Sequence, residues 1–242
     1  MKGLIAASTV ALAFASGTAQ AALFSFASDS NPNQWTFTGN GGNITAATGA
    51  TPLTLNIDDN NGPSPAIQVS VSFVAQYTLT FVGSVNLPGG AQALSYAANG
   101  SFTFSDGANP LLTTTFTNAL FSVRASPNNI WATTASLQVD DGLGATVSMV
   151  WGGANLPAYG LAPGALTGTP RGFGFDFTAI NSSGAIPYNG EAPGRAIDAT
   201  TKLPTGQWWS ESSYSAVANV IPSPGSLALL GLGGLAITRR RR

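Results

Sequence analysis

The 242-residue chain contains no cysteine and no histidine. These absences exclude disulfide bonds, thiolate nucleophiles, imidazole bases and the usual zinc ligand sets. Catalysis would have to rely on carboxylates, as in a glycoside hydrolase, and Glu191 and Glu211 are the only glutamates. Nothing in their spacing sets these two at the separation that such an enzyme needs. We therefore expect a protein without catalytic residues.

Charge is also scarce, because charged residues make up only 8% of the sequence. Five of the nine bases, Lys2 and the arginines at 239–242, lie close to the two ends of the chain. All ten acids lie between Asp29 and Glu211, which leaves residues 22–218 with four bases, ten acids and a net charge of −6. Such an acidic body offers no basic stripe for phosphates, so we expect no nucleic-acid partner.

The first 21 residues have the three sections of a secretory signal peptide. Lys2 supplies a positive charge, residues 4–15 are largely apolar, and residues 16–22 are mostly small. Ala19 and Ala21 form the Ala-x-Ala pattern of a signal peptidase substrate, and the apolar stretch is too short for an ordinary membrane span. We expect export through the Sec machinery, a helical signal, and cleavage by signal peptidase after Ala21.

The last residues, 219–242, show a second ordered pattern. Pro222, Ser223 and Pro224 precede an uninterrupted apolar segment at 225–238, and the chain ends on Arg239, Arg240, Arg241 and Arg242. As a helix, the apolar segment would be about 21 Å long against a hydrocarbon core of about 30 Å, a marginal span. The arginines favour the cytoplasmic side, so the tail would stop translocation and leave the body outside.

This order resembles the PEP-CTERM sorting signal of exported bacterial proteins, which has a Pro-Glu-Pro motif or a close variant, an apolar segment and an arginine cluster. The resemblance covers about a tenth of the chain, and Ser223 stands where the family usually has glutamate. It implies an exosortase as partner, a membrane enzyme that cuts near the Pro-x-Pro motif and passes the body to the envelope or to extracellular polysaccharide. The C-terminal helix would then hold the protein in the membrane only transiently, before it reaches the cell surface or the extracellular space. The alternative is a permanent single-span anchor.

The body, residues 22–218, alternates between apolar and polar residues. At 67–81 every odd position is apolar, and this period of two predicts a β-strand. The segment exceeds the usual strand length, so we expect a bend or a bulge in it. Alternation recurs at 133–139, 145–151 and 173–179, and no segment has a sustained helical period. We predict an all-β fold with an antiparallel β-sandwich or jelly-roll-like body.

Turn chemistry predicts two hairpins within this body. Residues 140–144 contain Asp-Gly and separate the alternating segments 133–139 and 145–151. Residues 106–110 likewise contain Asp-Gly and separate two arms rich in Thr, Ser and Phe.

Acidic turns raise the question of a metal. Carboxylate and amide oxygens that Ca²⁺ could use occur in two places, Asp58, Asp59, Asn60 and Asn61, and the pair Asp140 and Asp141. Neither place has the spacing of an EF-hand loop, and aspartate and asparagine are common in turns for conformational reasons alone. We expect no other cofactor.

Five tryptophans raise the hypothesis of sugar binding, because flat ring faces stack on the C–H faces of pyranoses. Trp151 is in phase with the apolar positions of its segment, so we expect it in the core. Trp208 and Trp209 are adjacent, and adjacent strand residues point to opposite faces, so one should be buried while the other can be exposed. We take these two residues as the candidate glycan contacts.

The expected function is that of a structural or adhesive, non-enzymatic component of the cell surface or extracellular matrix. A carbohydrate-binding surface module is the alternative, and a carboxylate-based glycoside hydrolase is a third, less favoured hypothesis.

Overall fold

The structure is a computed structural model that describes residues 21–27, 35–39, 42–48, 53–58, 67–140, 144–159, 163–182 and 194–219. Within these ranges the elements are β-strands, apart from two short 3-10 helices, η1 (Pro88–Gly90) and η3 (Leu156–Tyr159). None of the helices described there is long and apolar enough to cross a membrane. The expected signal helix and C-terminal apolar helix lie outside the described residues.

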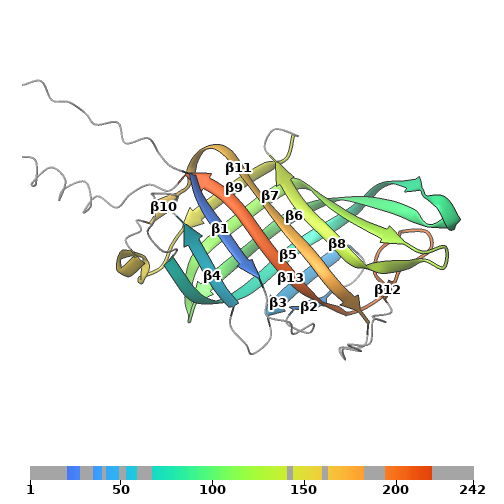
Figure 1. Cartoon of the computed structure of the whole chain (residues 1–242), viewed down its shortest axis with the longest axis horizontal. Coiled ribbons are helices and arrows are strands. Elements are labelled where there is room, and N and C mark those ends of the chain that lie inside the picture. Colours follow the sequence, from blue (N-terminus) through green and yellow to red (C-terminus); the bar gives the residue numbers. More distant parts are fainter. Residues whose placement is uncertain are drawn as a thin grey trace, which may run out of the picture.

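Eight strands pair into a closed antiparallel barrel (Figure 1). Around the ring they are β1 (Ala21–Ala27), β4 (Leu53–Asp58), β5 (Ile67–Asn86), β6 (Gln92–Asp106), β7 (Asn109–Ala125), β8 (Ile130–Asp140), β11 (Thr167–Asn181) and β13 (Trp208–Asn219). The ring closes because β13 pairs with β1, so that Phe24 lies opposite Ala216. The all-β antiparallel prediction is confirmed. The strands form a closed barrel instead of the two facing sheets of the expected sandwich or jelly roll.

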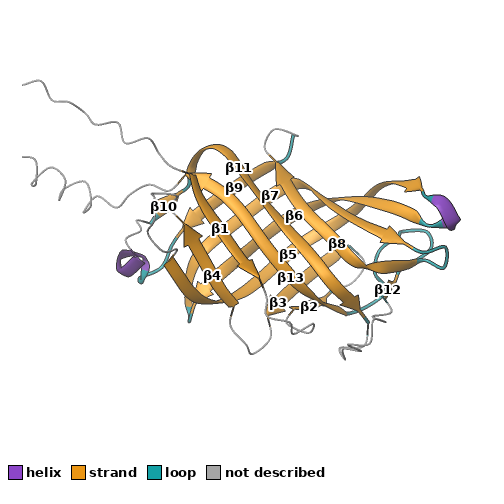
Figure 2. Ribbon diagram, viewed as in Figure 1, coloured by secondary structure: helices purple, strands orange, loops and turns teal. Residues whose placement is uncertain are grey.

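Shorter strands complete the wall where the long ones extend beyond their neighbours (Figure 2). A hairpin of β2 (Trp35–Thr38) and β3 (Asn43–Thr48) joins β13 to β5 alongside the β1–β4 pair. The remaining short strands pair at their edges, and they are β9 (Thr146–Trp151) with β7, β10 (Gly164–Ala165) with β9, and β12 (Arg195–Ala196) with β8.

Strand β5 shows how the alternation builds this wall. Its odd-numbered residues from Val69 to Leu79 are buried and its even-numbered residues are exposed, as the period of two predicts. The expected bulge is present, because the register against β6 shifts between Phe81 and Gly83. On its other side, β5 pairs first with β4 and then with β3.

The predicted hairpin at 106–110 is confirmed, since Asp106 pairs with Asn109 and Gly107 has a φ of 59° in the turn between β6 and β7. The predicted hairpin at 140–144 is wrong. Strands β8 and β9 both run antiparallel to β7, with Leu120 opposite Gln138 and Thr117 opposite Thr146. They therefore lie end to end as one interrupted strand. The chain therefore has the same direction in β8 and in β9, and local turn chemistry does not distinguish this arrangement from a hairpin.

Aromatic side chains fill the interior of the barrel. Phe102 lies among six other rings, with centroid distances between 5.0 and 6.2 Å; these rings are Phe73, Phe104, Phe116, Phe173, Phe175 and Tyr214. An eight-stranded barrel is just wide enough for its own side chains to fill. The inward positions of the strands accordingly make one continuous core.

Close approach of β5 and β6 depends on a glycine. A Cβ at Gly100 would lie 2.2 Å from the carbonyl oxygen of Gln76 and 2.5 Å from the Cα of Tyr77. The register of β6 against β7 shifts between Ala98 and Gly100. Gly100 thus permits the two strands to pack closely where the wall bends.

Candidate functional site

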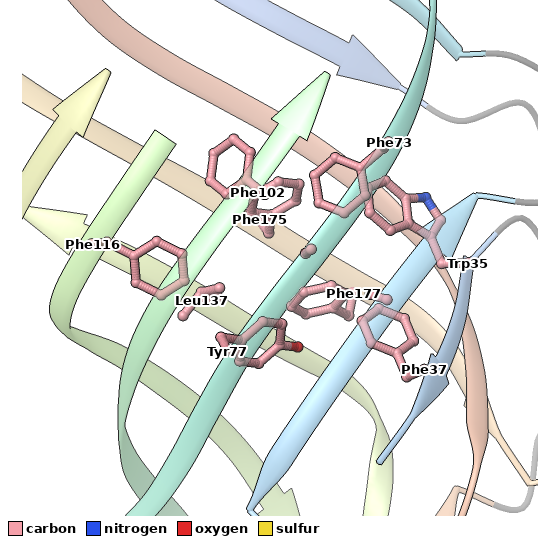
Figure 3. A pocket seen from close by; sticks show the side chains of 11 residues that line it. Trp35, Phe37, Phe73, Tyr77, Phe102, Phe116, Leu137, Phe175 and Phe177 are labelled. Atoms are coloured by element: carbon pink, nitrogen blue, oxygen red, sulfur yellow. The ribbon is translucent and has the colours of Figure 1, made fainter. Parts of the chain in front are cut away.

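A small cavity within the barrel is one candidate for a binding site (Figure 3). Its volume is about 10 Å³, and its lining is aromatic and aliphatic, with Trp35, Phe37, Phe116 and Phe177 among the residues that face it. A single water molecule needs about this much space. The cavity is therefore too small for a ligand.

Tyr77 is the one titratable residue among the described residues that line this cavity. Its hydroxyl is buried and has no hydrogen-bond partner among the described residues. Burial raises the pKa of Tyr77 well above its ordinary value, so the phenol stays neutral. A neutral phenol with no base beside it can neither activate a nucleophile nor hold a metal, and Tyr77 belongs to the core.

Four of the five tryptophans are buried, and they are Trp35, Trp131, Trp151 and Trp208. The prediction that Trp151 belongs to the core is confirmed. Trp208 stacks on Phe37 with centroids 3.7 Å and planes 4° apart, so its ring face is covered and its assignment as a glycan contact is wrong. Trp209 is only half-buried and lies on the outer wall. The expectation that one of the adjacent pair is buried is confirmed, and Trp209 is the less buried of the two.

The surroundings of Trp209 are polar. Strand pairing sets it opposite Thr36 of β2 on one side and Asn181 of β11 on the other. Glu211 is the next residue of β13 on the same face, and its Oε2 accepts a hydrogen bond of 3.2 Å from the Thr178 hydroxyl of β11. The half-buried Trp209 thus lies beside a carboxylate that a neighbouring strand holds in place.

A bulge in β11 shapes this part of the wall. The register against β13 shifts between Thr178 and Asn181, and Ala179 has a φ of 52°, a region that residues with a Cβ rarely occupy. The extra residue lets Ile180 stay in the core and sets Asn181 opposite Trp209. Bulges commonly redirect side chains in this way beside functional sites.

A groove of about 350 Å³ crosses the outer wall over β6, β7, β8 and β11. Its floor is a row of small and polar side chains in which each residue lies opposite the next, and the row is Ser95, Ser122, Ser136 and Asp176. Among the described residues of the lining, Arg124 is the one cation. Small side chains leave the hollow open, and the two charged groups give it polarity.

The segment 194–207 covers one end of the barrel, next to β12 at the right of Figure 1. Trp131 Nε1 donates to the Tyr96 hydroxyl at 3.1 Å, and this hydroxyl donates to the Lys202 carbonyl oxygen. Burial raises the pKa of Tyr96, although the bond from Trp131 lowers it in part. Lys202 Nζ donates to Asn129 Oδ1 at 3.0 Å. These bonds tie the covering segment to the core.

An aspartate organises the same segment. The Asp198 carboxylate accepts hydrogen bonds from the backbone N–H groups of Thr200 and Thr201 and from the Thr201 hydroxyl. These three hydrogen bonds lower the pKa of Asp198, and the bond from the Thr201 backbone has the largest effect. The carboxylate is occupied in a turn, which is a structural role.

Several residues singled out from the sequence lie outside the described residues; these are Ala19, Pro222, Ser223, Pro224, Arg239, Arg240, Arg241, Arg242, Glu191, Asp59, Asn60, Asn61 and Asp141. Ala21 is the first residue of β1, and Asp58 and Asp140 are the last residues of β4 and β8. Within the described part of the chain, no group of three or more acidic residues could hold a metal ion. The groove residues Arg124 and Asp176 were not predicted, because only the pairing of strands brings them together.

No family model, curated protein or solved structure matches the chain. The function is therefore inferred from its own residues and geometry.

Proposed function

We propose that the chain is an exported protein that an exosortase sorts to the cell surface or extracellular matrix, where the barrel is a structural or adhesive component without enzymatic activity. The order of the terminal segments supports the route. The N-terminal 21 residues combine a positive charge, an apolar stretch and Ala-x-Ala, and the C-terminal residues combine Pro222, Ser223 and Pro224 with an apolar run and four arginines.

The packed interior is the observation that supports the role of the body. Aromatic rings fill the barrel, and the cavity among them has a volume of only about 10 Å³. A substrate could not enter such a core, so the barrel would act through its outer wall. That wall carries mostly serine and threonine with few charges, which suits a stable component of a hydrated matrix.

A carbohydrate-binding role is the second candidate, and one observation favours it. Trp209 is the least buried of the five tryptophans, and Glu211 lies beside it on the same face. Hydrolysis of polysaccharide by carboxylates is the third hypothesis. Turnover of a polysaccharide by the purified protein would support it over the structural role and over carbohydrate binding.

The mass of the mature protein at the cell surface tests the sorting route. We expect the intact mass to correspond to a chain that starts at Ala22 and lacks the residues 225–242. A surface protein that keeps Arg239, Arg240, Arg241 and Arg242 would show a permanent anchor instead.

A matched variant sharpens this test. Ser223→Glu restores the glutamate that the resembling signals usually have, so we expect faster conversion from the longer to the shorter form in a pulse-chase experiment. Replacing all four terminal arginines by glutamine should abolish retention in the membrane and leave the chain unprocessed. Equal processing of all three chains would contradict the proposed route.

A further inference from the structure

We propose that the outer wall of the barrel binds a neutral oligosaccharide, with Trp209 as the stacking platform and the groove over β6, β7, β8 and β11 as the hydroxyl-binding surface. The inference deepens the proposed surface role, on which it rests for the presence of polysaccharide.

Trp209 is the least buried of the five tryptophans. Four tryptophans are at most 2% exposed, whereas Trp209 is half-buried on the outward face of β13, on a wall of mainly small, polar side chains. An indole in that position exposes apolar surface to water, which a ligand with an apolar face can cover. The C–H face of a pyranose is such a surface, and its hydroxyls require polar partners around the ring.

Glu211 supplies the first of these partners. Thr178 holds one carboxylate oxygen through the 3.2 Å hydrogen bond. An ionised carboxylate accepts at about four lone-pair positions, so most of its acceptor capacity stays available for sugar hydroxyls. The bond also restricts the side chain before a ligand arrives, which lowers the entropy cost of binding.

The strand register places Trp209 and Glu211 close to the groove. Asp176, which lines the groove, lies opposite Ser213 and precedes Thr178 by two residues on the outward face of β11. Asp176 and Glu211 are therefore diagonal neighbours across β11 and β13, at a typical spacing of about 7–8 Å. From there the row continues through Ser136, Ser122 and Ser95, at about 4.8 Å per strand. The track is long enough for several linked sugars.

The charged residues of this surface favour a neutral ligand over an anionic one. Asp176 and Glu211 oppose a single cation, Arg124, and phosphate- or uronate-bearing polymers would meet net repulsion there. A protein partner is less well matched, because Leu94 and Val123, the large aliphatic residues among the described residues of the lining, are buried and cannot anchor a protein interface. Serine hydroxyls and carboxylates with a single indole suit a neutral, hydroxyl-rich chain.

Binding is measured with the full chain purified in a zwitterionic detergent that has no sugar headgroup. The probes are neutral gluco-, galacto- and manno-oligosaccharides of four to six units, with uronate oligosaccharides of equal length for comparison. We expect saturable binding to at least one neutral series and none to the uronates. Trp209→Ala should weaken binding about tenfold, and Trp209→Phe should restore part of it. Glu211→Gln should weaken binding while leaving the fold intact.

A second readout isolates the tryptophan itself. Because the other four indoles are buried, acrylamide should quench mainly the fluorescence of Trp209, and a bound oligosaccharide should protect it. Thr115→Val, on the outward face of β7 away from the groove, is the matched control and should bind like the unaltered chain. Absence of binding to every neutral probe, or binding unchanged by Trp209→Ala, would overturn this inference. Neither result depends on the mature mass at the surface, so failure of the sorting route is seen separately.

Discussion

The interior and the outer wall of the barrel come from the same strands and differ in almost every property. Inward positions carry mainly aromatic and aliphatic residues with a few small polar ones such as Thr114 and Ser210, and no charged side chain of the described residues is buried there. Outward positions carry mainly serine, threonine and small residues, together with the charged groups, Trp209 and a few exposed aliphatic residues such as Val74 and Leu120. A strand with a period of two separates these roles residue by residue. The interior therefore supplies stability, and recognition is left to the wall.

The contrast predicts a large effect of truncation in the interior. Phe102→Ala should lower the free energy of unfolding by about 3–5 kcal/mol, because six neighbouring rings lose a packing partner and cannot close the cavity. Thr115→Val, an exposed and volume-matched change on the adjacent strand, should alter it by less than about 0.5 kcal/mol. Guanidinium unfolding followed by fluorescence measures both. Similar effects of the two substitutions would show that the interior is not tightly packed.

Two buried tyrosines sharpen the comparison within the interior itself. The Tyr77 hydroxyl has no hydrogen-bond partner among the described residues, so Tyr77→Phe should raise the free energy of unfolding by about 1 kcal/mol. The Tyr96 hydroxyl bonds to Trp131 and Lys202, so Tyr96→Phe should lower it by about 1–3 kcal/mol and leave the Trp131 N–H unpaired. The two variants remove the same atom, and changes of the same sign would contradict the assigned contacts.

Much of the local structure was predictable from the sequence. The alternation in β5 specified which residues face the core, and the same reasoning separated Trp208 from Trp209 and placed Trp151 inside. These predictions succeed because burial of one strand face depends on the period alone.

The arrangement of the strands was less accessible, for a physical reason. A period of two defines faces but not neighbours, so a closed barrel and a sandwich have the same pattern. The Asp-Gly segment at 140–144 illustrates the limit, because β8 and β9 pair with the same strand and continue in one direction. The groove could not be predicted from the sequence for the same reason, because only the strand register brings Ser95, Ser122 and Asp176 into one row.

The segment 194–207 has contacts with both the interior and the outer wall. Its contribution to stability should be smaller than that of the core and should depend on pH. Hydrogen bonds lower the pKa of Asp198 in the folded protein, whereas an unfolded aspartate has a pKa of about 3.9. The folded state then binds fewer protons than the unfolded state near that pH, so the stabilisation is complete above it and is lost as pH falls through the lower folded value. Asp198→Asn keeps a carbonyl acceptor but removes the charge. We expect the variant to melt slightly below the unaltered chain at pH 6 and at the same temperature near pH 2, and a difference that persists at pH 2 would exclude the carboxylate as its source.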